Sequence, residues 1–343
     1  QVEIDQIDMS LSPLETWRFC PRCTHAEDIA TGDAHACPSC GEPHWGDLGQ
    51  RRQLVRLRQV RATTEDARSR IGDEAEDREP TFYTRQLLPD FLARDVEFAY
   101  RLASDALPFG FEFIRRIKFR ELNFGKYGEA GEISIIAGTE SARPGFRICR
   151  HCGKVQRPRR QPPSPHAFNC PMRDREDAQA LVDCLYLYRE FESEALRILV
   201  PLTEVASDER PLDSFVAALQ LGLKLKFRGR VDHLRMTSYA EPDPETGAPC
   251  RYLLLYDSVP GGTGYLHELL RDERQLLDVF ALARDHMVAC PCNHDPDKDG
   301  CYECLYAYRL SHGMEATSRR TAVDLLSRIL DAKERLERVP MLR

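Results

Sequence analysis

The pattern of apolar and polar residues predicts a chain that contains both strands and helices. Between residues 51 and 148, short segments such as QLVRLRQVRA and EISIIAG alternate apolar with polar positions. This two-residue period is typical of strands with one buried face. From Phe109 to Phe113 aromatic residues alternate with Gly110 and Glu112, so we expect the aromatic face to be buried and the opposite face to be unburied. The region is therefore predicted to be mostly β.

Apolar positions spaced three or four residues apart predict helices in other parts of the chain. Residues 86–107 place Phe91 and Val96 on one face, and from residue 174 to about 200 a longer apolar stripe follows Asp174, which we expect to cap the first turn. The same reasoning, together with turn signals, predicts helices at 213–223, 265–277 and 318–337 and strands at 231–240 and 251–259.

The composition is that of a globular protein. Of the 343 residues 42% are apolar and 30% are charged, and this length allows two or three domains of roughly 100–200 residues each. The formal net charge is −7, which excludes a uniformly basic nucleic-acid-binding protein. A contact with DNA must therefore come from a local basic patch.

The sequence shows neither a membrane span nor a secretory signal. No apolar run approaches the ~18 residues that a transmembrane helix needs, and no signal-peptide pattern opens the chain. We therefore expect a cytoplasmic protein with no membrane partner. Because the chain begins with Gln1 and not with Met, we also expect a fragment or a processed product.

Thirteen cysteines give the clearest chemical signal. Their odd number and the missing secretory signal argue against a disulfide scaffold, and eleven of them fall into three compact groups. The first group has two Cys-x2-Cys pairs separated by thirteen residues. Each pair presents two thiolates at a tight turn, and together they supply the tetrahedral sulfur shell that zinc prefers. The predicted ligands of this zinc ribbon are Cys20, Cys23, Cys37 and Cys40.

The second and third groups have comparable spacings. The predicted ligands of the second are Cys149, Cys152, His166 and Cys170. His151 is the alternative nitrogen donor, although a residue between two knuckle cysteines normally points away from the metal. The predicted ligands of the third are Cys290, Cys292, Cys301 and Cys304. The loop between these pairs has alternating aspartates, but it lacks the glutamate and the flanking helices of a calcium-binding EF-hand.

Each group offers four protein ligands, which indicates structural and not catalytic metal sites. A catalytic zinc normally keeps one coordination position open for water or substrate. We therefore expect about three structural zinc ions, each holding together a segment too small to bury its own core. We expect no catalytic site in this chain.

Two basic stretches and one glycine-rich turn are the candidate contacts with nucleic acid. The candidates are Arg115 and Arg116 on a strand, Lys154, Arg157, Arg159 and Arg160 in the loop of the second zinc group, and Gly261 and Gly262 in the turn VPGGTG. Arginines on a rigid knuckle suit phosphates, and a glycine turn before a helix exposes backbone N–H groups to an anion. Each candidate has an alternative interpretation without nucleic acid. The strand arginines would form ion pairs within the protein, the zinc loop would be solvated, and the glycines would form a tight strand-to-helix turn. No Gly-Lys-Ser/Thr follows the glycines, so the turn is not a P-loop and no ATPase motor is visible.

The segment from Ala178 to Arg309 resembles the MrfA-type zinc-binding domain, a module at the C-terminal end of many superfamily-two DNA helicases. The resemblance rests on EALRILVP, on LLLYDSVPGGTGYLHELL and on CPCNHDPDKDGCYECLYAYR. Upstream, WRFCPRC and GFRICRHCGKVQRP look like the region that links the helicase lobes to that domain.

The resemblance implies that Cys290, Cys292, Cys301 and Cys304 are the zinc ligands of that domain. It further implies ATP-dependent 3′→5′ translocation or unwinding of DNA, in bacterial DNA repair or in antiviral defence against phage. Both RecA-like lobes are missing from this sequence, so this activity would belong to lobes in cis or to a partner in trans. The chain itself would bind DNA, which we take to be single-stranded. The alternative is a separate zinc-binding adaptor subunit that recruits a helicase or a nuclease.

The predicted architecture is α+β, with several small zinc-bound modules around a mixed core of helices and antiparallel strands. We predict a zinc ribbon at 1–50, a mostly β linking domain at 51–148, a zinc knuckle at 149–173, and the MrfA-type domain with its zinc cluster and final helix at 174–343.

Overall fold

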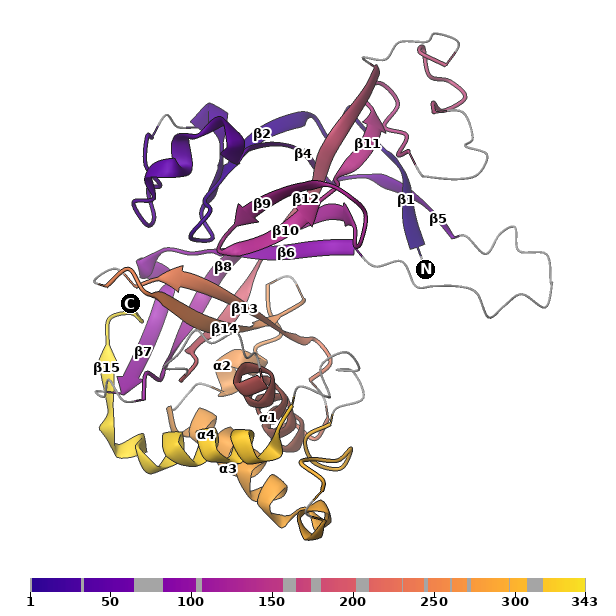
Figure 1. Ribbon diagram of the computed structural model, residues 1–343. Coiled ribbons are helices and arrows are strands. Elements are labelled where there is room, and N and C mark those ends of the chain that lie inside the picture. Colours follow the sequence, from indigo (N-terminus) through magenta and orange to yellow (C-terminus); the bar gives the residue numbers. More distant parts are fainter. Residues whose placement is uncertain are drawn as a thin grey trace, which may run out of the picture. The chain divides into compact units, whose positions relative to one another are not determined.

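The computed structural model describes residues 2–31, 34–64, 83–102, 107–156, 165–173, 180–201, 210–229, 231–243, 246–259, 261–269, 273–295, 297–306 and 317–342. The chain divides into two compact units: Gln1–Asp90 with Phe119–Phe191, and Phe91–Lys118 with Glu192–Arg343. Strands β8 (Gly110–Lys126) and β12 (Leu181–Leu199) each contribute residues to both units. The predicted α+β class with cysteine-rich zinc modules is confirmed (Figure 1).

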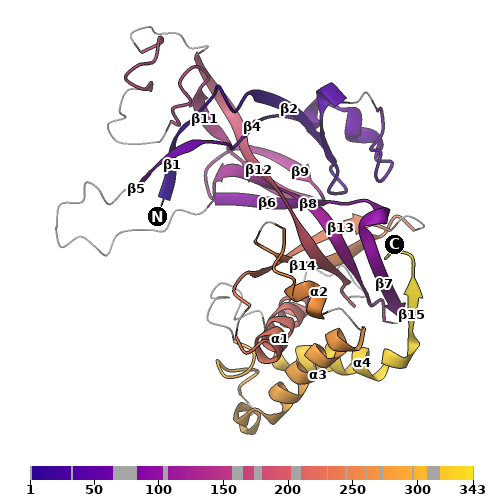
Figure 2. The ribbon, with the colours of Figure 1, turned by 180° about the vertical axis from the view of Figure 1, so that it is seen from behind.

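The first unit is built almost entirely from strands. Its further elements are β1 (Val2–Ile7), β2 (Leu14–Phe19), β3 (Ala26–Asp28), η1 (Ile29–Thr31), η2 (Pro43–Gly46), η3 (Leu48–Gln50), β4 (Arg51–Arg56), β5 (Val60–Thr64), β6 (Tyr83–Asp90), β9 (Glu132–Ile136), β10 (Thr139–Arg143) and β11 (Phe146–Cys149). Strand β2 pairs antiparallel with β3 and β4, and β4 pairs parallel with β12. Strand β6 pairs with β8, and β11 pairs with β12. Strands β1 and β5 form a separate ribbon, seen from behind in Figure 2, and β9 and β10 form another.

Two clusters of buried side chains stabilise the first unit. The larger one is rich in aromatic residues, among them Trp17, Phe124 and Tyr186. The rings of Phe124 and Tyr186 meet edge to face with centroids 4.9 Å apart, an arrangement that adds to the gain from burial. The smaller cluster joins Ile7 of β1 to Ile148 of β11 and to neighbouring residues of β4 and β12. It therefore fixes the second zinc region against the N-terminal strand.

The described part of the second unit combines strands with four α-helices. Its further elements are η5 (Ala93–Asp95), β7 (Val96–Leu102), α1 (Arg210–Lys226), β13 (Leu234–Pro242), β14 (Pro249–Asp257), α2 (Tyr265–Leu269), α3 (Glu273–Ala289), η7 (Pro291–His294), α4 (Arg319–Asp331), η9 (Lys333–Arg335) and β15 (Leu336–Val339). Strand β14 pairs antiparallel with β12 and β13, and β7 pairs antiparallel with β8 and β15. None of the described helices is both long enough and apolar enough to cross a membrane.

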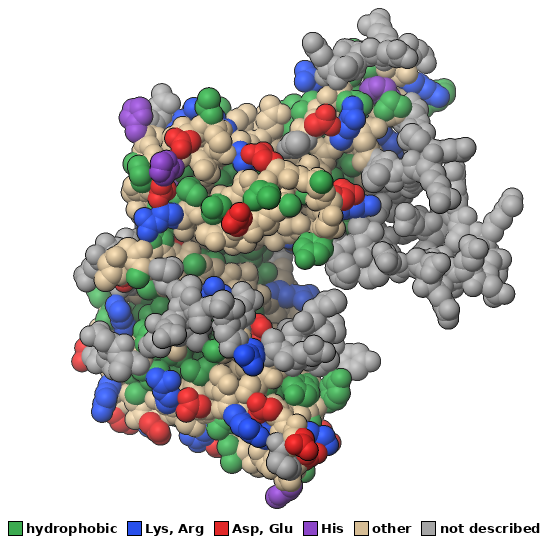
Figure 3. Space-filling model, viewed as in Figure 1, with side chains coloured by type: hydrophobic (Ala, Val, Ile, Leu, Met, Phe, Trp, Pro, Cys, Tyr) green, Lys and Arg blue, Asp and Glu red, His purple; other side chains and the backbone are tan. Residues whose placement is uncertain are grey.

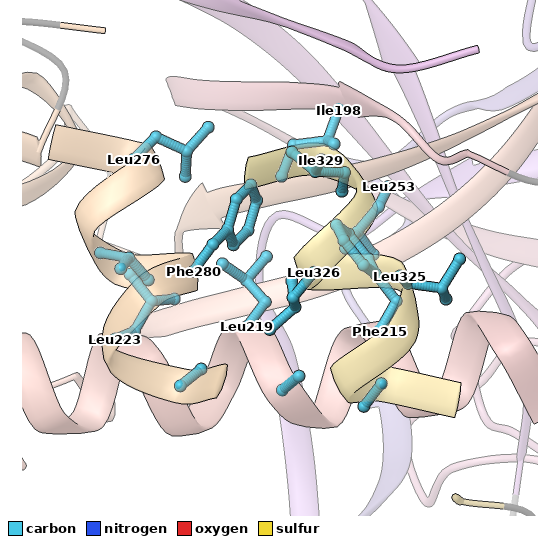
Figure 4. Close-up of a cluster of buried hydrophobic side chains, with 14 of the residues drawn as sticks. Ile198, Phe215, Leu219, Leu223, Leu253, Leu276, Phe280, Leu325, Leu326 and Ile329 are labelled. Atoms are coloured by element: carbon cyan, nitrogen blue, oxygen red, sulfur yellow. The ribbon is translucent and has the colours of Figure 1, made fainter. Parts of the chain in front are cut away.

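Helices α1, α3 and α4 pack on one another and on the strands around one apolar core. Figure 4 shows Phe215 of α1, Phe280 of α3 and Leu326 of α4 pointing toward one another, with Leu253 of β14 beside them. The close approach of α1 and α3 depends on Gly222, because a Cβ atom there would lie 2.4 Å from the carbonyl oxygen of Val279. This core holds the segments that carry the third zinc group.

Several predicted elements are confirmed. The stretch from 51 to 148 is mostly β, α1 covers the helix predicted at 213–223, and β13 and β14 are the two predicted strands. The helix predicted at 265–277 contains α2 and the first residues of α3, with 270–272 outside the described residues, and the helix predicted at 318–337 ends earlier, at the end of α4.

Two helix predictions are wrong. Residues 86–107 contain parts of β6 and β7, and the stretch predicted as a long helix after residue 174 contains strand β12. In β12, Leu185–Tyr188 and Ala195–Leu199 are buried at every position. A strand covered on both faces is apolar throughout, so its residues also satisfy the three- and four-residue spacing of a helix.

The prediction of one unburied face at Phe109–Phe113 is also wrong. Glu112 is fully buried, because Arg197 lies beside it and pairs with its carboxylate at 2.6 Å. The alternation of aromatic and polar residues therefore reflects a buried ion pair and not exposure to water.

Candidate metal centres and DNA-contact residues

Four sulfur atoms from two tight turns meet in the first zinc group. The Sγ atoms of Cys20 and Cys40 are 3.5 Å apart, and those of Cys23 and Cys37 are 3.6 Å apart. The second turn closes because Gly41 adopts a φ of +74° and donates its N–H to the carbonyl of Cys37 at 2.8 Å. Fully buried Trp45 covers the group. The structure therefore brings together all four residues that the spacing predicts.

Three sulfur atoms and one imidazole form the second group. Nδ1 of His166 lies 3.2 Å from Sγ of Cys149 and 3.6 Å from Sγ of Cys170, and Cys152 completes the group. His166 is buried, whereas His151 is exposed and lies outside this set. Of the two histidines that the sequence leaves open, the structure brings His166 to the ligand position.

The third group joins η7 to the turn that follows it. The Sγ atoms of Cys290 and Cys301 are 3.5 Å apart, and those of Cys292 and Cys304 are 3.7 Å apart. All four ligand atoms of each group lie within 4.8 Å of one another.

These distances fit zinc. In a tetrahedron with Zn–S bonds of about 2.3 Å the sulfur atoms are about 3.8 Å apart, whereas a disulfide bond is about 2.05 Å long. The measured separations between paired sulfurs, from 3.5 Å to 3.9 Å, match the tetrahedron and exclude disulfides. The chain therefore has three structural zinc sites, each with four protein ligands.

The buried thiols Cys149 and Cys304 resist the loss of their protons. Burial raises the pKa of Cys149 to about 11 and that of Cys304 to about 12. A bound divalent cation stabilises the thiolate form, so the buried sulfurs serve as ligands at neutral pH.

Two residues outside the cysteine motifs support the third group, and the sequence analysis missed both. Arg319, at the start of α4, is buried and donates from Nη1 to Sγ of Cys292 at 2.8 Å. Asp299, in the aspartate-rich loop, accepts hydrogen bonds from the Ser318 hydroxyl at 2.6 Å and from the N–H of Arg320 at 3.0 Å. Both residues connect the loop to α4. A helix that opens with a basic residue gives no local signal of such contacts.

The candidate DNA contacts on the strand and in the glycine turn converge on one pocket of the second unit. A pocket of about 580 Å³ is lined by Asp95, Arg115, Arg116, Glu192, Ser193 and Gly261. Both arginines are exposed, and Arg116 lies 3.5 Å from the carboxylate of Asp95. Arg115 and Arg116 therefore present guanidinium groups beside the turn, although the two segments are far apart in the sequence.

The backbone N–H groups of the glycine turn are already hydrogen-bonded. Gly261 donates to the carbonyl of Glu192 at 3.2 Å, and Gly262 donates to the carbonyl of Val259 at 2.9 Å. The buried carboxylate of Asp257 accepts the N–H and the hydroxyl of Thr263 at 2.6 Å and 2.5 Å. Any contact of this turn with phosphate would therefore come from the neighbouring arginines and not from these amides.

Of the candidate basic residues in the second zinc loop, the structure describes Lys154. Lys154 donates from Nζ to both carboxylate oxygens of Asp5, at 2.8 Å and 2.9 Å, which fixes the knuckle to β1. The candidates Arg157, Arg159 and Arg160 lie outside the described residues. On the face shown in Figure 3, the described basic and acidic side chains are interspersed. The pocket with Arg115 and Arg116 is thus the best-defined basic feature of the candidate set.

Comparisons with known proteins agree with the metal sites. Residues 215–305 match the family model of the MrfA Zn-binding domain. A crystal structure of the DUF1998 helicase MrfA bound to DNA is similar over 74% of this chain, with 12% sequence identity and a TM-score of 0.39. The chain spans only 25% of the length of that helicase chain. No curated protein matches the sequence.

The second unit thus contains a zinc-stabilised module in which a four-cysteine site closes a mixed helix and strand core. Residues 215–305 of this module match the MrfA Zn-binding domain, as the motifs predict.

Proposed function

We propose that the chain is a zinc-stabilised DNA-handling region of an ATP-dependent superfamily-two DNA helicase that acts in bacterial DNA repair or in antiviral defence. The observation that carries this proposal is the MrfA-type zinc-binding domain at 215–305. The similar crystal structure is that of a helicase bound to DNA. In this proposal the motor lies outside the chain, which contacts the strand that the RecA-like lobes deliver in the cytoplasm.

The mechanism is one of contact. The zinc sites fix the turns on which side chains are presented, and Arg115 and Arg116 bind phosphates at the mouth of the pocket beside Gly261. The four regions predicted from the sequence remain part of this proposal, with the ribbon and the knuckle positioning the strand on its way to the MrfA-type domain.

The test measures binding of fluorescent single-stranded DNA to the zinc-loaded chain at several salt concentrations. Each phosphate contact contributes about −0.7 to the slope of log affinity against log salt. We expect the double variant Arg115→Ala/Arg116→Ala to bind about tenfold more weakly near 0.1 M salt, with a slope smaller by about one unit. The control is Arg335→Ala/Arg338→Ala, which removes the same charge from exposed positions of the same unit outside the pocket. Equal effects of the two double variants would remove the pocket from the proposal.

The adaptor subunit stays the second candidate because several predicted DNA contacts are engaged within the protein. Lys154 pairs with Asp5, and Arg116 pairs with Asp95. An adaptor would bind DNA weakly and with a slope near zero, but would form a stable complex with separately expressed helicase lobes.

A further inference from the structure

A second pocket, of about 300 Å³, lies in the first unit beside the second zinc group. Three segments that are distant in the sequence form its walls: the end of β1, the turn before β5 and the zinc knuckle. The knuckle is fixed to β1, because the N–H of Ile7 donates to the carbonyl of Gly153 at 2.9 Å and Nε2 of Gln6 donates to that of Cys152 at 2.6 Å. The zinc site thus sets the shape of this pocket.

The lining combines flat apolar surface with exposed hydrogen-bonding groups. Val60 and Pro171 supply apolar contacts, while Gln59, Arg61, His151 and Asn169 supply two amides, a guanidinium and an imidazole. All six are exposed. The side chains of Gln59, His151 and Asn169 make no hydrogen bond within the described part of the chain, so their donors and acceptors are available to a ligand.

The carboxylate in this lining is held in its ionised form by local contacts. Asp8 accepts the hydroxyl of Ser10 at 2.5 Å and its N–H at 3.0 Å, and these bonds, with a smaller contribution from Arg61, lower the pKa of Asp8. Arg61 offsets this negative charge, and the exposed amides and imidazole of the lining suit a ligand with a polar edge.

An exposed aromatic residue directly precedes one of the lining residues. Phe168 directly precedes Asn169 and is 87% exposed, an unusual cost for an apolar side chain in water. The guanidinium of Arg173 lies 4.5 Å from the centre of its ring, and Nη1 of Arg173 donates to the carbonyl of Phe168 at 3.3 Å. The ring is thus held in place by an arginine whose charge also favours phosphate.

We propose that this pocket binds one unstacked base of a single-stranded DNA, with Phe168 stacking on the next base and Arg61 contacting a phosphate. This inference rests on the proposed DNA-handling function and adds the position at which the strand is held. A base has an apolar face and a polar edge. Val60 and Pro171 offer apolar surface to the face, and Asn169 and His151 offer hydrogen-bonding groups to the edge.

The experiment uses the zinc-loaded full chain and fluorescent DNA strands of about twelve nucleotides. We expect Phe168→Ala, Asn169→Ala and Arg61→Ala each to weaken binding about fivefold to tenfold, since stacking of one base accounts for changes of this size. The matched controls are Tyr127→Ala, which removes another exposed aromatic ring of the same unit, and Arg58→Ala, which removes a charge three residues before Arg61, from the bend before β5 and outside the lining. Both controls should bind within about twofold of the unchanged chain. Zinc content is measured for each variant, and a variant that keeps all of its zinc and still loses affinity supports the pocket.

A strand with abasic positions gives an independent readout. The unchanged chain should bind this strand about tenfold more weakly than the intact one, and the Phe168→Ala/Asn169→Ala variant should distinguish the two strands much less. Unchanged affinity in the three pocket variants, with weaker binding in Arg115→Ala/Arg116→Ala, would overturn the base pocket and leave the proposed function intact. No binding of single-stranded DNA by the unchanged chain would overturn the proposed function itself. Tighter binding of RNA than of DNA would overturn the assignment to DNA.

Discussion

Arg197 is the most heavily engaged charged residue of the second unit. Its side chain is 2% exposed and lies 2.6 Å from the carboxylate of Glu112 and 3.2 Å from that of Glu241. The ring of Tyr252 lies 4.2 Å from its guanidinium carbon. Arg197 also donates to the carbonyl of Leu342, whose N–H donates to Glu112 at 2.7 Å. This pair therefore ties the segment after β15 to β8 and β12.

Removal of Arg197 should destabilise the fold strongly. Arg197→Met leaves the Glu112 carboxylate buried without its cation, which costs about 3–5 kcal/mol of unfolding free energy, whereas Arg197→Met/Glu112→Gln should lose less because no unpaired charge remains. Urea unfolding of the two variants measures the difference. Equal losses would mean that packing and not charge accounts for the role of this pair.

The loss in Arg197→Met should also depend on pH. Burial raises the pKa of Glu112, and Arg197 opposes that rise. Without Arg197 the folded-state pKa of Glu112 rises further above the unfolded-state value of 4.5, so the stability of the variant should fall as pH increases above about 4.5. A pH-independent difference from the unchanged chain would contradict this.

At the scale of elements, the sequence predicts best where one face of an element is exposed. Helix α1 and strand β13 show the expected periodicities because each has a wetter side. Two stretches of β12, Leu185–Tyr188 and Ala195–Leu199, are buried on both sides, so their mostly apolar pattern cannot distinguish strand from helix. The helix prediction for residues 86–107 is wrong for another reason. Strand β7 is stabilised by pairing with β8 and β15, and no local sequence pattern encodes these contacts.

The contact between the zinc knuckle and β1 gives an element-scale prediction. Gly153 has a φ of +68°, and a Cβ atom there would lie 1.8 Å from the carbonyl oxygen of Ile7. Gly153→Ala should therefore lower the unfolding free energy of the chain by at least about 2 kcal/mol and weaken zinc retention in the second group. Gly128→Ala is the control, because Gly128 has a φ of +83° with nothing within 4 Å of its Cβ position. It should lose only the strain of the backbone, about 1–2 kcal/mol, in thermal unfolding monitored with zinc release. Equal losses in both variants would show that the approach to β1 is unimportant.

At the scale of the whole molecule, the metal ligands were the most predictable part and the pockets the least. Paired thiolates lie close together in the sequence, so spacing alone points to each group. The pocket with Arg115 and Gly261 joins residues about 150 positions apart, and the pocket beside the second zinc group joins β1 to the knuckle. Only the pairing of strands brings such residues together. The three zinc groups are divided between the two units, with two groups in the first unit and one in the second.

The loss of one zinc ligand should therefore destabilise only the unit that contains it. Cys301→Ser should lower the zinc content from about three ions to about two per chain and destabilise the second unit, because its four-cysteine site closes the segment between α3 and α4. Cys250→Ser is the matched control, since Cys250 belongs to none of the three groups. Metal analysis by mass spectrometry, combined with limited proteolysis, separates the outcomes. Cleavage confined to residues of the second unit, with two zinc ions retained, is the expected result. Full zinc content in Cys301→Ser would show that Cys301 is not a ligand, and loss of all three ions would show that the units do not hold their metals independently.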